Sequence, residues 1–195
     1  MTDPAATPPD PYSVIPGRPA WWSRKHIRPF QVDPDEADRI IQSAEMAAVS
    51  WVTAKAEPVT ALLNYLFIDG HITITSTTNR SKYKAWSANP AACFCIWDPG
   101  DVEKQLTIRG EMEIFRTEEF HRRWIEGLIR KLSRRDDLPE AVLERQFRLF
   151  DAPDRMYMRL HISRIVSYDG KKMRQAEKEG IDVWDVTPEQ AEQAE

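Results

Sequence analysis

A chain of 195 residues, with 42% hydrophobic residues and seven Trp, is long and apolar enough to form one globular domain. Its net charge of −4 argues against a broad nucleic-acid-binding surface. No apolar run reaches the length of a membrane span, and the first residues lack the basic and then apolar order of a secretory signal. With only two Cys, Cys93 and Cys95, the sequence predicts a reduced, cytoplasmic protein.

The uneven distribution of proline indicates how the chain is organised. More than half of the 14 Pro precede residue 35, in a segment without apolar periodicity. We therefore expect a Pro-rich N-terminal arm over 1–32, a folded domain over 33–176 and an acidic C-terminal tail over 177–195.

The domain begins with a predicted amphipathic helix. Asp33 is a favourable N-cap residue, and the acids that follow suit the positive end of the helix dipole. Apolar residues recur on one face, at Ala37, Ile41, Ala44 and Ala48.

Three strands are predicted next, because β-branched and aromatic residues dominate 48–55, 58–70 and 71–77. The Asp69-Gly70 pair is typical of a two-residue hairpin turn. A short helix over 81–90 follows and ends at Asn89-Pro90.

The second half of the chain again shows strand-like segments followed by a helical pattern. Two antiparallel strands are predicted over 91–98 and 103–116, followed by a helical insert over 117–150. The insert starts at Thr117, a favourable cap, and its apolar positions are Phe120, Trp124, Leu128 and Leu132, then Leu143, Phe147 and Phe150.

A last alternating strand begins near residue 155 and ends in a second Asp-Gly turn at 169–170. This order of elements predicts an α+β fold in which antiparallel strands curl into a barrel.

Familiar catalytic and metal-binding patterns are missing from the sequence. The four His show no paired ligand spacing, and Cys93-x-Cys95 has no second pair, so we expect no metal site. There is no G-x-S-x-G, G-x-G-x-x-G or Walker-type loop. The basic run over 121–135 lies mostly opposite the apolar stripe and is interrupted by Glu126, which favours a solvated helix face.

The stretch "TSTTNRSK", from Thr75 to Lys82, gathers hydroxyl and basic side chains between a strand end and a helix start. Amide groups at a helix start, hydroxyl donors and charged Arg and Lys side chains together suit a phosphate group. Read alone, the same residues also suit an ordinary polar turn.

The block "ITSTTNRSKYKAWSANPAACFCIW", followed by "KQLTIRGEMEIF", resembles the pyridoxamine 5'-phosphate oxidase-like FMN-binding split barrels. In that family a strand ends in small hydroxyl residues and leads into a Ser/Arg/Lys phosphate clamp. A short helix ending in Asn-Pro and two more strands follow. Asn89-Pro90 and Gly110 fit this order, which covers residues 46–116 well and "RLHISRIVSYDG" more loosely.

The resemblance implies an antiparallel split β-barrel with an N-terminal helix, a short helix after the third strand, and the helical insert. It also implies a homodimer with FMN, or a deazaflavin, at the subunit interface. The implied phosphate and ring contacts are Thr60, Thr75, Ser76, Thr77, Arg80, Ser81, Lys82 and Gln105, with Tyr168 contacting the cofactor from the partner subunit.

Two departures bear on the reaction. The strand "VTALLNYL" lacks the Arg and Lys of the oxidases, and the Arg-Leu-His signature is not seen after Tyr168. Both argue against pyridoxamine phosphate oxidation itself. The insert over 117–150 is longer than a barrel needs, and we expect it to cover the pocket.

The resulting hypothesis is a flavin- or deazaflavin-dependent oxidoreductase that acts on a small hydrophobic or planar substrate. Since the cofactor carries the hydride or electron chemistry, no catalytic side chain is assigned. A non-catalytic flavin-binding or sensing protein on the same fold stays open. An interaction module that uses the arm and insert is the remaining alternative, although it has no need of a phosphate clamp.

Overall fold

The computed structural model describes residues 30–179. The predicted arm over 1–32 and tail over 177–195 lie outside these residues, except at their inner ends. The described residues fall into two units, a larger one over Val32–Tyr168 and a smaller one that holds the last helix.

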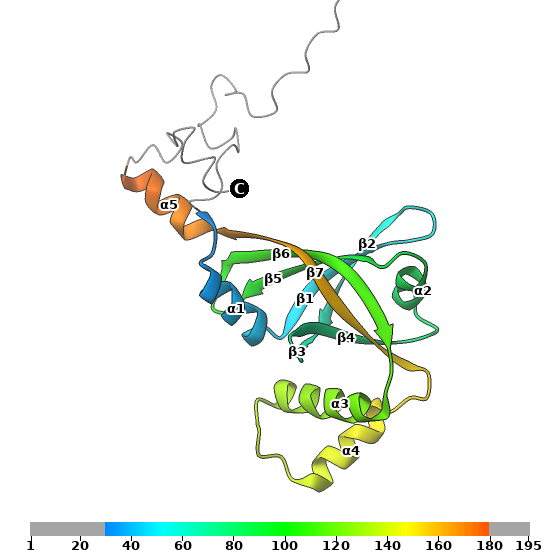
Figure 1. Ribbon diagram of the computed structural model, residues 1–195. Coiled ribbons are helices and arrows are strands. Elements are labelled where there is room, and N and C mark those ends of the chain that lie inside the picture. Colours follow the sequence, from blue (N-terminus) through cyan, green and yellow to red (C-terminus); the bar gives the residue numbers. More distant parts are fainter. Residues whose placement is uncertain (1–29, 180–195) are drawn as a thin grey trace, which may run out of the picture. The chain divides into compact units, whose positions relative to one another are not determined.

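Twelve helices and strands make up the described part of the chain (Figure 1). In chain order they are α1 (Pro34–Ser43), β1 (Met46–Val52), β2 (Pro58–Asn64), β3 (Leu66–Ile68), β4 (His71–Thr77), α2 (Ser81–Ala88), β5 (Ala91–Asp98), β6 (Asp101–Phe115), α3 (Glu118–Ser133), α4 (Glu140–Phe150), β7 (Arg155–Asp169) and α5 (Gly170–Glu179).

The seven strands form one sheet in the order β2-β1-β5-β6-β7-β4-β3, and hairpin neighbours pair antiparallel. Within the larger unit the sheet curls, because side chains from both of its halves meet in one core. Val49 of β1, Ile74 of β4 and Phe94 of β5 are all fully buried in the same cluster. The predicted α+β split barrel is therefore confirmed as a curled antiparallel sheet with helices between strands.

Two helices close this core. Helix α1 contributes Ile40 and Ile41, and α2 contributes Trp86, whose ring meets Trp51 of β1 edge-on at 5.5 Å. Helix α2 contacts β1, β4 and β6. It therefore lies where the two halves of the curled sheet approach one another.

Three local predictions are confirmed, whereas Asp33 stands at the N-cap of α1 without a side-chain capping hydrogen bond. Asp69 and Gly70 both have positive φ, 52° and 77°, as a type I′ hairpin turn requires. Thr117 accepts a hydrogen bond from the Phe120 amide and caps α3. Helix α2 ends at Asn89 as predicted.

Three predicted details are wrong. Helix α1 ends at Ser43, so Ala48 belongs to β1. The predicted strand over 58–70 is two strands, β2 and β3, interrupted at Tyr65. Leu132 is 46% exposed, because each four-residue step rotates the side chain by roughly 40° around a helix with 3.6 residues per turn.

The helical insert packs on the sheet through a second core. Phe120 and Trp124 of α3 meet Leu143 of α4 and Tyr157 of β7 in this cluster. The apolar face predicted for the insert is therefore used against β3 and β7. In the described part of the chain no helix is long and apolar enough to cross a membrane.

The prediction for the end of the last strand is wrong. The chain continues from β7 into α5, where a second Asp-Gly turn was expected. The Asp169 carboxylate accepts the amides of Lys171 and Lys172 at 2.9 and 3.3 Å, which satisfies the first donors of the helix. Good helix formers follow it, so the pair starts a helix.

One basic residue of the insert is not on a solvated face. The Lys131 ammonium donates to the Ala44 and Tyr65 carbonyls at 2.7 and 3.0 Å. It also lies 4.4 Å from the centre of the Tyr65 ring. Burial lowers the pKa of Lys131 to about 8, although Glu45 acts in the opposite direction.

This shift predicts a pH dependence of stability. Between pH 8 and 10 the unfolded chain binds more protons at Lys131 than the folded chain does, so the free energy of unfolding should rise with pH. Lys131→Met should lose most of that rise in urea unfolding, whereas exposed Lys84→Met should keep it. Equal slopes for wild type and Lys131→Met would contradict the assignment.

Candidate functional site

The predicted phosphate segment forms a tight connection between β4 and α2. The Arg80 amide donates to the Thr77 carbonyl at 3.1 Å, and the Thr78 amide donates to the Asp154 carbonyl at 3.1 Å. Helix α2 starts at Ser81, with Arg80 in the N-cap position and no acidic residue in the first turn. The first turn of α2 thus carries basic but no acidic side chains, although the Thr78 hydroxyl just before it donates to the Asp154 carboxylate at 3.4 Å.

Lys82 is the most informative residue of this segment. Its side chain is half-buried but makes no hydrogen bond or ion pair with any residue in the described part of the chain. Burial lowers the pKa of Lys82, and the positive charge of Arg80 lowers it further. A partly desolvated ammonium without a counter-ion is costly, and a bound anion would offset that cost.

The side chains of Arg80 and Ser81 are exposed and, among the described residues, also make no hydrogen bond. Thr77 donates its hydroxyl to Asn79 at 2.7 Å. The three residues Arg80, Ser81 and Lys82 thus gather two cations and a hydroxyl at one helix start. This donor set fits a phosphate group.

Unlike Arg80, Ser81 and Lys82, the residues Thr75 and Ser76 use their hydroxyls in hydrogen bonds to the backbone. The Thr75 hydroxyl donates to the Met156 carbonyl at 2.9 Å, and Ser76 is 4% exposed with its hydroxyl on the Thr77 carbonyl. In this state both hydroxyls are used within the protein. These two residues therefore fix the strand end, and their contact with a ligand stays a prediction.

Arg116, the residue between β6 and the insert, supports the same strand end, a role that the sequence did not reveal. Arg116 donates to the carbonyls of Ala152 and Arg155, at 2.9 and 3.0 Å. Arg155 in turn pairs with Thr77 across the β7–β4 ladder. The connection from α4 to β7 is thereby fixed beside the phosphate segment.

A buried histidine adds to this support. His121 of α3 is 1% exposed, and its ring nitrogens lie 2.8 Å from the Tyr157 hydroxyl and 3.0 Å from the Asp151 carboxylate. Tyr157 pairs with Thr75 in the sheet. The sequence shows a lone His on an apolar helix here, and only the tertiary contacts reveal its partners.

The other predicted contacts lie elsewhere in the larger unit. Thr60 is on β2, with its hydroxyl 2.9 Å from that of Ser50. Gln105 is on β6 and donates to the Val102 carbonyl at 3.1 Å. Tyr168 lies at the far end of β7 from Arg155, roughly 40 Å along the strand at 3.3 Å per residue.

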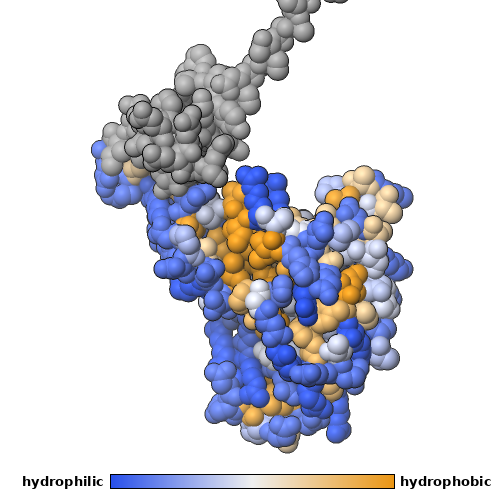
Figure 2. Space-filling view, in the orientation of Figure 1, coloured by the Kyte–Doolittle hydropathy of each residue, from blue (hydrophilic) through white to orange (hydrophobic). Residues whose placement is uncertain are grey.

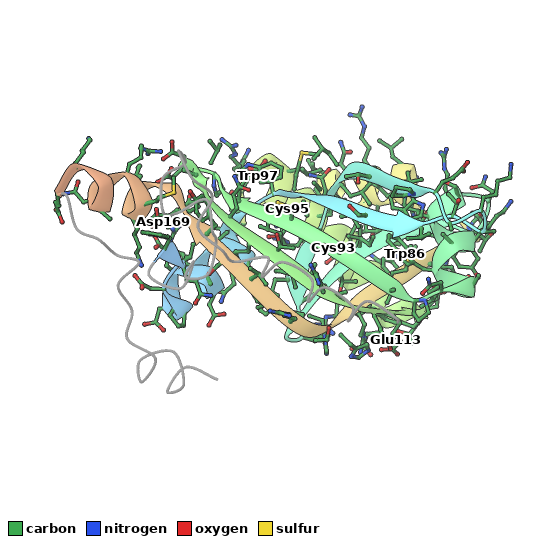
Figure 3. The ribbon with its side chains drawn as sticks, turned by 90° about the horizontal axis from the view of Figure 1, so that it is seen from above. Trp86, Cys93, Cys95, Trp97, Glu113 and Asp169 are labelled. Atoms are coloured by element: carbon green, nitrogen blue, oxygen red, sulfur yellow. The ribbon has the colours of Figure 1, made fainter. Side chains whose placement is uncertain are left out.

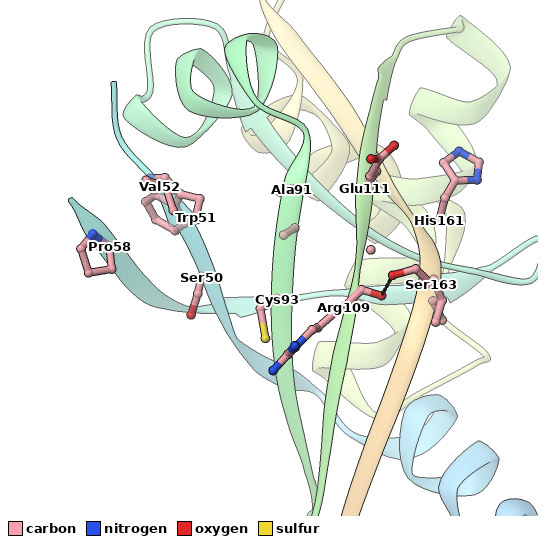
Figure 4. A pocket seen from close by; sticks show the side chains of 13 residues that line it. Ser50, Trp51, Val52, Pro58, Ala91, Cys93, Arg109, Glu111, His161 and Ser163 are labelled. Atoms are coloured by element: carbon pink, nitrogen blue, oxygen red, sulfur yellow. Dashed lines mark hydrogen bonds between the residues drawn. The ribbon is translucent and has the colours of Figure 1, made fainter. Parts of the chain in front are cut away.

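A hollow lies on the outer face of the sheet, the face turned away from the core (Figure 4). Its volume is about 650 Å³, and the lining comes from β1, β2, β5, β6 and β7, with no residue of the insert. The insert was expected to cover the pocket, but it does not cover this hollow. Cross-strand pairing sets Ser50, Cys93 and Arg109 in one row across its floor.

The outer face continues along β5 with Cys93, Cys95 and Trp97, which follow one another at alternate positions (Figure 3). Both cysteines are free thiols. Burial raises the pKa of Cys95, and so does Cys93 beside it. The described residues hold no group of three or more His, Cys, Asp or Glu side chains placed to bind a metal ion.

Gly110 shapes the floor of the hollow. A Cβ atom at this position would lie 2.1 Å from the His161 carbonyl oxygen of β7. Ser163 also donates its hydroxyl to the Arg109 carbonyl at 3.2 Å. Strands β6 and β7 therefore cross so closely that only glycine fits.

Known structures were compared with this fold. No protein-family model matches the chain, and no curated protein sequence matches it. A conserved hypothetical protein from Mycobacterium tuberculosis has a similar structure, with a TM-score of 0.67 and 16% identity, over 77% of this chain and 92% of that one.

Two further neighbours each have a TM-score of 0.51 and 16% identity. One is a candidate pyridoxamine 5'-phosphate oxidase from Listeria innocua, over 68% of this chain and 95% of that one. The other is general stress protein 26 from Bacillus anthracis, over 69% and 92%. The chain thus has the pyridoxamine 5'-phosphate oxidase-like split-barrel fold, which confirms the resemblance seen in the sequence.

The close crossing at Gly110 predicts a sharp substitution effect. Gly110→Ala must push β6 and β7 apart and should destabilise the protein by about 3 kcal/mol, the upper end for overpacking. Gly127→Ala, where the Cβ would meet only the end of the Leu66 side chain at 3.0 Å, is the control. Similar urea midpoints for both variants would contradict the role given to Gly110.

Proposed function

We propose that the protein is an oxidoreductase that binds FMN, or a deazaflavin with the same kind of phosphate, at the start of α2. The observation that carries the proposal is the half-buried Lys82, which has no counter-ion among the described residues. The fold shared with a candidate pyridoxamine 5'-phosphate oxidase also supports it.

The roles of the chain's own residues follow from their positions. Lys82 and Arg80 would neutralise the phosphate, and the Ser81 hydroxyl and the first amides of α2 would donate hydrogen bonds to it. The cofactor would supply hydride or electron transfer to or from a small hydrophobic or planar substrate. The protein's part is to bind, orient and shield the cofactor.

A homodimer belongs to the same proposal. In one chain, β7 carries Tyr168 away from the phosphate segment, so Tyr168 would reach a cofactor only in a partner subunit. Apolar side chains are exposed over the strands between α1 and α2 (Figure 2). Leu62 of β2 is 59% exposed, which suits coverage by a second subunit.

The phosphate clamp predicts a preference for FMN over riboflavin, which lacks the phosphate. Fluorescence titration should give a Kd for FMN at least tenfold lower, and Lys82→Ala should raise that Kd by about 10- to 100-fold through loss of a charge-assisted bond. Riboflavin binding should change little. Arg145→Ala serves as the control, because it removes an exposed arginine of α4 that has no hydrogen bond or ion pair within residues 30–179.

A deazaflavin titrated in the same way decides between the two cofactors. Equal affinity for FMN and riboflavin would contradict the proposed phosphate clamp. Binding of neither FMN nor the deazaflavin would reject the proposed oxidoreductase function. Binding without turnover by any reductant and acceptor would favour the non-catalytic alternative.

The dimer has its own test. Lys82→Ala and Tyr168→Ala subunits should each bind FMN weakly, but a mixed dimer contains one site with both side chains intact. Refolding the two variants together should therefore restore tight binding at about half of the sites in the mixed dimers. Failure of the mixture to restore any tight site would place Lys82 and Tyr168 in one subunit's site or in none.

A further inference from the structure

The hollow on the outer face of the sheet has the size and lining of a small-molecule site. Its volume of about 650 Å³ lies within the usual range for ligand pockets. Val52, Pro58 and Ile162 provide apolar walls. A planar hydrocarbon body would be desolvated well against these side chains.

Arg109 is the cationic residue among those that line this pocket. Its guanidinium makes no hydrogen bond or ion pair with any described residue. Of the other charged residues on β6, Lys104 lies 2.5 Å from Glu36 and Glu113 lies 2.8 Å from His161. Unlike these two residues, Arg109 has all of its guanidinium donors unused within residues 30–179.

Glu111 limits what Arg109 could hold. It lines the same pocket two residues further along β6 and likewise forms no ion pair within residues 30–179. In Figure 4 Arg109 extends beside Cys93, whereas Glu111 points toward the opposite end of the pocket. A second negative charge on a ligand would meet Glu111, so one anionic group is favoured over two.

We propose that this pocket binds a planar, largely apolar molecule with a single carboxylate, which Arg109 holds through two parallel hydrogen bonds. Guanidinium and carboxylate match in this geometry, and the apolar walls take the rest of the molecule. That the bound molecule is the substrate rests on the proposed function. The binding itself requires no cofactor.

The proposal is tested by calorimetry on the full chain with 2-naphthoate and its neutral analogue 2-naphthamide. Naphthoate should bind at least tenfold more tightly, because only its carboxylate can pair with Arg109. Arg109→Gln should bring the two affinities together, and Arg109→Lys should restore part of the difference. Arg145→Gln is the matched control, and the urea midpoint of each variant verifies folding.

A dianionic probe tests the role of Glu111. Naphthalene-2,6-dicarboxylate should bind wild type more weakly than naphthoate, and Glu111→Gln should reduce that gap. Equal affinities of naphthoate and naphthamide, or an Arg109→Gln variant that still discriminates them, would overturn the proposal. Binding of neither probe, as expected if a second copy of the chain fills the hollow, would overturn it as well.

The two proposals fail separately. Arg109-dependent naphthoate binding in a protein that binds neither FMN nor a deazaflavin would support the pocket and reject the oxidoreductase. Lys82-dependent FMN binding without naphthoate binding would support the phosphate clamp and reject the Arg109 pocket. Neither readout uses a variant from the other site.

Discussion

The contact between β6 and β7 at Gly110 is the constraint on which the larger unit depends. This pair joins the β2-β1-β5-β6 part of the sheet to the β7-β4-β3 part. With the His161 carbonyl where a side chain would otherwise lie, the two strands pack backbone to backbone. The sheet can then curl around one core, which α2 closes by contacting strands from both parts.

The same join links the two proposed binding regions. On one side, β7 pairs with β4 and fixes the strand end that leads into the clamp of Arg80, Ser81 and Lys82. On the other, β6 carries Arg109 and Glu111 on the outer face. Arg116, just before the insert, and His121, within it, strengthen the first side through hydrogen bonds to residues at the start of β7. Each region is thus built on a strand whose position is fixed by several contacts.

Local chemistry explains which features the sequence predicted. The Asp69-Gly70 turn, the Thr117 cap and the end of α2 at Asn89 each depend on residues a few positions apart. Features that depend on distant partners were missed. Lys131 looked like part of a solvated face because its partners lie 66 and 87 residues away. At Asp169-Gly170 a local signal misled, since the same pair can begin a turn or cap a helix.

The proposed clamp brings two like charges close together. Arg80 and Lys82 both lie at the positive end of α2, and no described acidic side chain pairs with them. Their repulsion works against the start of α2, although its backbone is well fixed. Under the proposed function, a phosphate bound there would offset this repulsion, so cofactor binding and the stability of α2 would be thermodynamically linked.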